Sequence, residues 1–193
     1  MKKILEGHLN NLIKTLLVTK NELDTIGEVS NTLLSSIKNK KKIFVYGNGG
    51  SFADSSHFVG ELTATYKKKR KPLPFFLLGS NIASISAWGN DYSFNDYISR
   101  ELDGYGTKED VLIILSTSGG NFKKKQSINL IKMANLAKRK GIIIISFLGK
   151  GGGVLKNKSD ISYVVKSNIT ATVQEVHKCL LHSICELIDR NIK

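Results

Sequence analysis

The sequence is poor in cysteine, in acidic residues and in long apolar runs. Its 193 residues include only two Cys and 16 Asp or Glu, against 29 Lys or Arg. Cys179 and Cys185 are expected on one helix, so they do not suggest a disulfide framework. No apolar run reaches the length of about 18 residues that a transmembrane helix needs, and the N-terminus lacks the apolar segment of a signal peptide. We therefore expect a cytoplasmic protein with a single domain over residues 1–193.

The shortage of acidic residues leaves a formal net charge of +13. Such a charge favours anionic partners, which include phosphorylated metabolites, nucleic acid and acidic lipid surfaces. The basic residues gather in three runs, 38–42, 67–71 and 123–125. Each run lies at the edge of a predicted element, and no stacking aromatics or nucleic-acid motif accompany them. We interpret the runs as solvated surface and expect neither nucleic acid nor a membrane as a partner.

Apolar runs that predict buried strands alternate with segments that predict helices. The predicted strands cover residues 43–46, 72–78, 111–115, 141–147 and 161–165. The alternation is typical of an α/β fold with a parallel sheet covered on both faces. Two amphipathic helices precede the first strand, at residues 4–18 and from Asp24 to about residue 37. Their apolar stripes could pack on the same chain or on another subunit, and periodicity leaves both possibilities open.

The most informative stretch joins the first predicted strand to the next helix, at residues 47–51 (Gly-Asn-Gly-Gly-Ser). Its glycines allow a ligand to approach the backbone, and Ser51 is predicted to cap a helix whose N-terminus can bind an anion. His57 and Glu61 follow four residues apart and share one helix face. An imidazole and a carboxylate in that arrangement can bind a metal or move protons. A solvated side-chain contact is the competing interpretation.

A second polar turn follows the third predicted strand. The hydroxyls of Ser116, Thr117 and Ser118 precede a helix predicted at about residues 122–138, and such a turn suits a phosphate group. An unusually polar loop is the alternative. Both turns should meet at the carboxyl edge of the sheet. The first turn lacks the later glycine of a dinucleotide fingerprint and the lysine of a Walker motif, so a phosphorylated small molecule is favoured over a nucleotide.

The last predicted helix begins near Thr172, which with Glu175 forms a capping box. Gln174 and His182 lie eight residues apart and therefore on roughly one side of this helix. His177 lies on an adjacent side of the same predicted helix, and we interpret it as a structural residue.

Together these residues resemble the sugar isomerase (SIS) domain family and, within it, the bacterial phosphoheptose isomerases. The resemblance covers nearly the whole chain. It implies a three-layer α/β sandwich with a five-stranded parallel sheet. It also implies a homotetramer with active sites between subunits, in which the N-terminal helices (about residues 1–40) pack on the core and on neighbouring subunits. The motifs that carry it are residues 47–51, His57 with Glu61, Gly89-Asn90-Asp91, Ser116–Gly119, and Gln174 with His182.

The resemblance also implies roles for individual residues. One divalent metal per active site, usually zinc, is held by His57, Glu61, Gln174 and His182. Glu61 and His182 are the catalytic pair that transfers protons. The residues implied to bind the substrate are Asn48, Gly49, Gly50, Ser51, Glu61, Asn90, Asp91, Ser116, Thr117, Ser118, Asn121 and Gln174.

Three positions depart from the family pattern. Asn121 stands where family members often have a serine, and its amide can still donate a hydrogen bond to a phosphate. Thr65 and Ala171 stand near positions that are often Arg and Asp, so both charges are missing here. These departures leave the preferred substrate open.

The implied activity is aldose–ketose isomerisation. Sedoheptulose 7-phosphate becomes D-glycero-D-manno-heptose 7-phosphate through an enediol, the first step of nucleotide-activated heptose biosynthesis for lipopolysaccharide, capsule or S-layer glycan. One alternative is a non-catalytic SIS scaffold that binds the bacterial replication initiator, with which the basic charge is compatible. Another is a sugar-phosphate-sensing regulator, although such proteins usually carry a helix-turn-helix domain. The presence of His57, Glu61, Gln174 and His182 together favours the isomerase.

Overall fold

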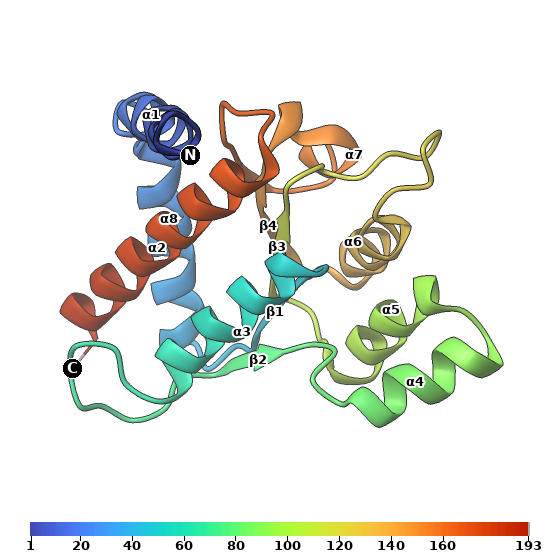
Figure 1. Ribbon diagram of the computed structural model, residues 1–193. Helices are drawn as coiled ribbons and strands as arrows, with labels where there is room; N and C mark the ends of the chain where they lie inside the picture. The colour runs from blue at the N-terminus through green and yellow to red at the C-terminus, as the bar shows by residue number, and fades with distance from the viewer. Residues whose placement is uncertain (193) are drawn as a thin grey trace.

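The computed structural model of the chain describes residues 1–192. Within this range a parallel sheet has the strand order β2-β1-β3-β4-β5 (Figure 1). The order reverses between β1 and β3, and in such sheets the ligand crevice opens at the carboxyl ends of those two strands. The strands are β1 (Ile43–Gly47), β2 (Phe75–Leu77), β3 (Val111–Ser116), β4 (Ile143–Leu148) and β5 (Ile161–Val164).

Helices cover both faces of the sheet and make a three-layer α/β sandwich, which confirms the predicted fold class (Figure 1). Each face has its own apolar cluster, and β1 and β3 contribute side chains to both clusters. This explains why the two strands are apolar at nearly every position. One face carries α1 (Lys2–Thr19), α2 (Asp24–Lys38), α3 (Gly50–Thr63) and α8 (Thr170–Asn191), and the other carries α4 (Ile82–Asp91), α5 (Phe94–Tyr105), α6 (Ile128–Lys140) and the short η1 (Lys150–Gly152) and α7 (Gly153–Lys156).

Helix α5 was not predicted from the sequence. Its cap is an ordinary one, because the Ser93 hydroxyl accepts a hydrogen bond from the backbone N–H of Asn95 at 3.2 Å. Tyr97, Ile98 and Leu102 are its buried residues. With Phe94 and Tyr105 these residues recur at helical spacing (i, i+3, i+4, i+8 and i+11), so the sequence pattern could have predicted this helix.

Helix α6 begins six residues later than predicted, at Ile128 instead of about residue 122. Asn121 and Gln126 pair through two backbone hydrogen bonds of 2.9 Å each, so residues 121–126 form a small hairpin. Its three consecutive lysines are exposed, and so is Phe122. This segment has no apolar face to bury, and that removes the main stabilisation of a helix there.

Two predicted helix caps are wrong. Helix α3 begins at Gly50 with Gly49 as its N-cap, and the buried Ser51 makes no capping hydrogen bond. The turn itself supplies the acceptors, because the carbonyls of Asn48 and Gly49 accept from the N–H groups of Ser51 and Phe52 at 3.1 and 2.9 Å. Helix α8 begins at Thr170, so Thr172 is buried inside its first turn instead of capping it.

Helix α1 exposes most of its apolar stripe. Leu5, Leu9, Ile13 and Leu17 are between 54 % and 62 % exposed, and the buried residues of the helix are Thr15 and Thr19. These four residues therefore face away from the rest of this chain, whereas Leu12 and Leu16 pack against its core. Within residues 1–192, no helix has both the length and the apolar character needed to cross a membrane.

Candidate active site

Helices α3 and α8 run side by side in the same direction (Figure 1). Their side chains meet at successive levels along the two helices. Near both N-termini, a Cβ atom at Gly50 would lie 2.2 Å from Nε2 of Gln174, so the amide of Gln174 packs directly against the backbone of α3. Further along, Nζ of Lys178 lies 3.2 Å from Oδ1 of Asp54. The next turns of the two helices bring their predicted catalytic side chains to one level.

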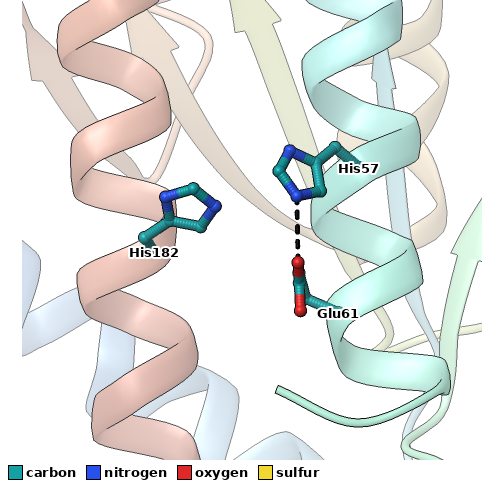
Figure 2. Close-up of side chains that lie close together, drawn as sticks. All are labelled: His57, Glu61 and His182. Carbon is teal, nitrogen blue, oxygen red and sulfur yellow. Dashed lines mark hydrogen bonds and ion pairs between the residues drawn. The ribbon is translucent and has the colours of Figure 1, made fainter. Parts of the chain in front are cut away.

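Those side chains form a compact cluster of two imidazoles and one carboxylate. Figure 2 shows His57 and Glu61 on α3 and His182 on α8 pointing into the space between the helices. Nε2 of His57 is 2.9 Å from Oε1 of Glu61, and the two imidazole rings are 5.1 Å apart. One ligand atom from each residue lies within 4.8 Å of the other two. The cluster can bind a divalent metal, and its nitrogen and oxygen donors are those that zinc prefers.

A thiol lies close to this cluster without joining it. Cys185 is buried on α8. Burial, together with the carboxylates of Glu61 and Asp189, raises the pKa of the Cys185 thiol to about 12. A thiol that stays protonated is a poor metal ligand and a poor nucleophile. The groups of the site that can bind a metal or transfer protons are therefore its two imidazoles and its carboxylate.

Gln174 lies at a different level from the three clustered residues. Its amide contacts Gly50 in the first turn of α3, and Gly50 precedes His57 by about 10 Å along the helix axis. The structure thus brings together three of the four predicted metal ligands. A role for Gln174 as the fourth ligand remains a prediction.

The second polar turn lies at the carboxyl end of β3. The hydroxyls of Ser116 and Ser118 accept hydrogen bonds from the backbone N–H groups of Gly119 and Gly120, at 3.1 and 3.3 Å. Gly119 has a φ of +65°, and a Cβ atom there would lie 1.9 Å from the carbonyl oxygen of Gly152. The turn is thus packed tightly against η1. Because Gly47 pairs with Leu115 in the sheet, the first polar turn begins beside Ser116.

Sequence reasoning missed Ser127, which the structure brings to this turn. Its hydroxyl lies 3.5 Å from the hydroxyl of Ser118, and it is the N-cap residue of α6. Asn121, the predicted fourth side chain of the phosphate site, instead accepts a hydrogen bond from the backbone of Lys124 at 3.0 Å within its own hairpin. A serine just before the apolar run of α6 is a common helix-start pattern and could have identified Ser127.

Asn129 is a second residue that sequence reasoning missed. It is 2 % exposed and exchanges two amide hydrogen bonds with Asn48, at 3.0 and 2.7 Å. Burial raises the pKa of the nearby Tyr46 to about 12, and the Asn129 side chain opposes that shift. Asn129 therefore fixes the orientation of Asn48 at the mouth of the crevice. A single asparagine in an amphipathic helix gives no sequence pattern that would reveal this role.

A cavity of about 490 Å³ opens beside the first polar turn and reaches the start of α4. The predicted substrate-binding residues Asn48 and Gly49 line it. Asn90 and Asp91 do not, because they are exposed at the far end of α4. They are the last two residues of the helix, and Nδ2 of Asn90 donates a hydrogen bond to Oδ1 of Asp91 at 2.8 Å. Among the described residues, no hydrogen bond joins either side chain to the crevice.

Comparisons with known proteins agree with this geometry. Residues 8–149 match the family model described as "SIS domain". The chain is 35 % identical to the phosphoheptose isomerase of Campylobacter concisus, over 98 % of this chain and 97 % of the relative. It is 40 % identical to the probable phosphoheptose isomerase of Thermoplasma acidophilum, over 86 % and 88 % of the two chains. The solved structure of a phosphoheptose isomerase from Francisella tularensis matches with a TM-score of 0.91 at 28 % identity, covering 98 % of each chain.

Proposed function

The chain belongs to the SIS domain family and, within it, to the phosphoheptose isomerases, and we propose that it converts sedoheptulose 7-phosphate to D-glycero-D-manno-heptose 7-phosphate. The relatives support the substrate. The observation that carries the reaction is the convergence of His57, Glu61 and His182 from two helices far apart in the sequence. The cluster lies between α3 and α8, and a hydroxyl-rich turn follows β3 at the carboxyl edge of the sheet that these helices cover. A scaffold that only binds another protein has no use for that convergence.

The reaction moves a proton between neighbouring carbons of an open-chain ketose. A base removes a proton from C1, an enediol forms, and a proton returns at C2 to give the aldose. We assign these two transfers to Glu61 and His182, which face each other across the space between α3 and α8 (Figure 2). A carboxylate and an imidazole suit the task because one can accept while the other donates.

A divalent metal fits the same residues. Two imidazoles and one carboxylate with convergent ligand atoms are a donor set that could hold zinc. When zinc is held by His57, Glu61 and His182, it supplies Lewis acidity toward the substrate carbonyl. Gln174, which lies nearer the N-termini of α3 and α8, is the proposed fourth ligand. The Glu61 carboxylate has a second oxygen besides the one that contacts His57, so holding a metal and moving a proton are compatible.

The far end of the substrate is held by the second turn. We assign the phosphate to Ser116, Thr117 and Ser118, and we replace Asn121 by Ser127 as the fourth side chain, because Ser127 faces Ser118. Asn48, which Asn129 holds in place, and the glycines of the first turn remain the proposed sugar contacts. Binding energy at the phosphate then orients the reacting carbons at the other end.

The proposed assembly is a homotetramer with active sites between subunits. Its support is the exposed apolar stripe of α1, which nothing in the described chain covers. Contiguous exposed apolar surface commonly marks a protein–protein interface. Asn90 and Asp91, remote from the crevice of their own chain, would then complete the site of a neighbouring copy.

The test is conversion of sedoheptulose 7-phosphate followed by NMR, with protein treated with a chelator and with protein refilled with Zn²⁺. We expect the zinc-loaded protein to form the heptose aldose, the chelated protein to lose this activity, and added zinc to restore it. A zinc-loaded protein that leaves the ketose unchanged would contradict the proposal.

A further inference from the structure

A buried ion pair lies beyond the end of α3, where no substrate contact is assigned. Arg70, in the segment that follows α3, is 6 % exposed, and Asp189, on α8, is 2 % exposed. Their closest atoms, Nε of Arg70 and Oδ1 of Asp189, are 2.7 Å apart. Asp189 lies seven residues, or about two helical turns, after His182, and therefore on the same side of α8.

The guanidinium of Arg70 also caps the C-terminus of α3. It donates to the carbonyl oxygen of Leu62 at 2.8 Å and to that of Glu61 at 3.0 Å. Carbonyl groups in the last turn of a helix have no partner within the helix, and a cation there also interacts favourably with the helix dipole. Arg70 is thus bonded to the backbone of the very residue that supplies the carboxylate of the cluster.

The second oxygen of Asp189 holds the segment between α3 and Arg70. Oδ2 accepts hydrogen bonds from the backbone N–H groups of Lys67 and Lys68, at 2.8 and 3.1 Å. The preceding residue, Tyr66, stacks on the His182 imidazole with ring centroids 6.0 Å apart and an angle of 17°. One carboxylate on α8 therefore fixes both the cap of α3 and the aromatic ring that packs on the catalytic histidine.

We propose that Arg70 and Asp189 are positioning residues for the isomerase site, which set the placement of Glu61 on α3 relative to His182 on α8. Neither side chain contributes a metal-binding atom to the cluster of His57, Glu61 and His182. Both therefore act on it through the backbone of Glu61 and through Tyr66. Residues that orient metal ligands from outside typically change metal affinity or activity 10- to 100-fold when they are replaced. The inference rests on the function proposed above, because it assigns these residues to that site.

The geometry requires arginine at this position. Its planar fork reaches one carboxylate and two carbonyl oxygens at once, from three different nitrogens. A lysine ammonium is a compact charge on a flexible stem and does not reproduce such a fork. Arg70→Lys should therefore keep the charge near Asp189 while losing the fixed connection to the end of α3.

The chain offers a matched control just before β3. Asp110 is also 2 % exposed. It accepts from the backbone N–H groups of Lys42 and Thr107 at 2.9 and 2.8 Å, and Nζ of Lys42 lies 3.4 Å away. Asp110→Asn thus disturbs a buried carboxylate with similar partners, but one whose hydrogen bonds and ion pair reach neither α3 nor α8.

The experiment compares Arg70→Lys, Asp189→Asn and Asp110→Asn with the wild-type protein. Zinc affinity is measured by isothermal titration calorimetry. Steady-state kinetics with sedoheptulose 7-phosphate give kcat and KM, and thermal unfolding gives the stability. For the two positioning variants we expect zinc affinity and kcat to fall by about tenfold or more, with KM within about threefold. Asp110→Asn should lower the melting temperature while leaving zinc affinity and kcat within about twofold of wild type.

A further variant distinguishes loss of positioning from loss of folding. Arg70→Ala leaves a space that free guanidinium can enter, and we expect millimolar guanidinium to raise its kcat while leaving that of Asp110→Asn unchanged. The proposal is overturned if Arg70→Lys and Asp189→Asn lose no more zinc affinity and kcat than Asp110→Asn does. If the wild-type protein does not turn over the ketose, the proposed function fails, and the zinc affinities alone still decide the positioning role.

Discussion

The two strand–turn–helix units at the carboxyl edge of the sheet differ in how soon the helix follows the strand. Only residues 48–49 separate β1 from α3, whereas residues 117–127 separate β3 from α6. The first unit carries its functional groups on the helix, as His57 and Glu61. The second carries them on the turn, as serine and threonine hydroxyls. In the proposed function, the same topology therefore serves proton transfer in one unit and anion binding in the other.

This division predicts different kinetic effects from the two units. An interaction made only in the transition state lowers kcat when it is removed, whereas one made equally in the ground state raises KM. Substitutions on α3 should therefore act on kcat, and substitutions in the turn after β3 should act mainly on KM.

The largest effect is expected for Glu61→Gln. Positioned acid–base groups contribute about 100- to 10,000-fold to the rate, so kcat should fall by at least about 100-fold with KM little changed. Steady-state kinetics with sedoheptulose 7-phosphate measure both constants, and circular dichroism with gel filtration checks the fold and the assembly. Turnover close to that of wild type would remove Glu61 from the mechanism.

An intermediate effect is expected in the second unit. Ser118→Ala and Ser127→Ala each remove a hydroxyl proposed to bind the phosphate. Since a hydrogen bond to a charged group contributes about 1.5–3 kcal/mol, KM should rise about tenfold or more, with kcat nearly unchanged. Asn121→Ala is the control, because its side chain bonds its own hairpin. If KM rises more in Asn121→Ala than in Ser127→Ala, the assignment of Ser127 is wrong.

The smallest effect on turnover is expected for the other histidine of α8. His177 is buried beside Phe147, and its Nε2 lies 3.3 Å from the carbonyl oxygen of Leu148. Burial lowers the pKa of His177 to about 4, below the value of about 6.5 in an unfolded chain. The unfolded chain therefore binds the proton more readily, so stability is complete above about pH 6.5 and is lost as the pH falls toward 4.

The corresponding variant is His177→Gln, which removes this titration. We expect it to lose up to about 3 kcal/mol of the pH dependence of unfolding between pH 7 and pH 4, measured by urea denaturation at a series of pH values. Its kcat at neutral pH should stay close to wild type. A variant that keeps the full pH dependence would show that another group carries it.

Local patterns were sufficient to predict the frame of the site. The strands follow from apolar runs, and the shared face of His57 and Glu61 follows from the helical repeat of 3.6 residues. Their meeting with His182 depends on how α3 packs against α8, for which the resemblance to known enzymes was needed. Periodicity alone places Gln174 and His182 on one side of a helix without saying what faces them.

The contacts that refine the site could not be predicted from local patterns. Because residues 121–126 form a hairpin, Ser127, and not Asn121, lies beside Ser118 in the turn after β3. Local sequence patterns did not predict this hairpin. The Asn48–Asn129 amide pair and the Arg70–Asp189 ion pair join residues far apart in the sequence. Such contacts are set by tertiary packing, and the residues involved look like ordinary polar surface when taken singly.

The most direct test of the account is the rate at which deuterium from D2O enters the sugar, followed by NMR with zinc-loaded protein. Glu61→Gln, His182→Gln and the double variant are compared with wild type. If the two helices supply one proton-transfer site, each single variant should slow the exchange by at least about 100-fold, and the double variant should be little slower than either. Exchange at the wild-type rate in either single variant, or losses that multiply in the double variant, would contradict it.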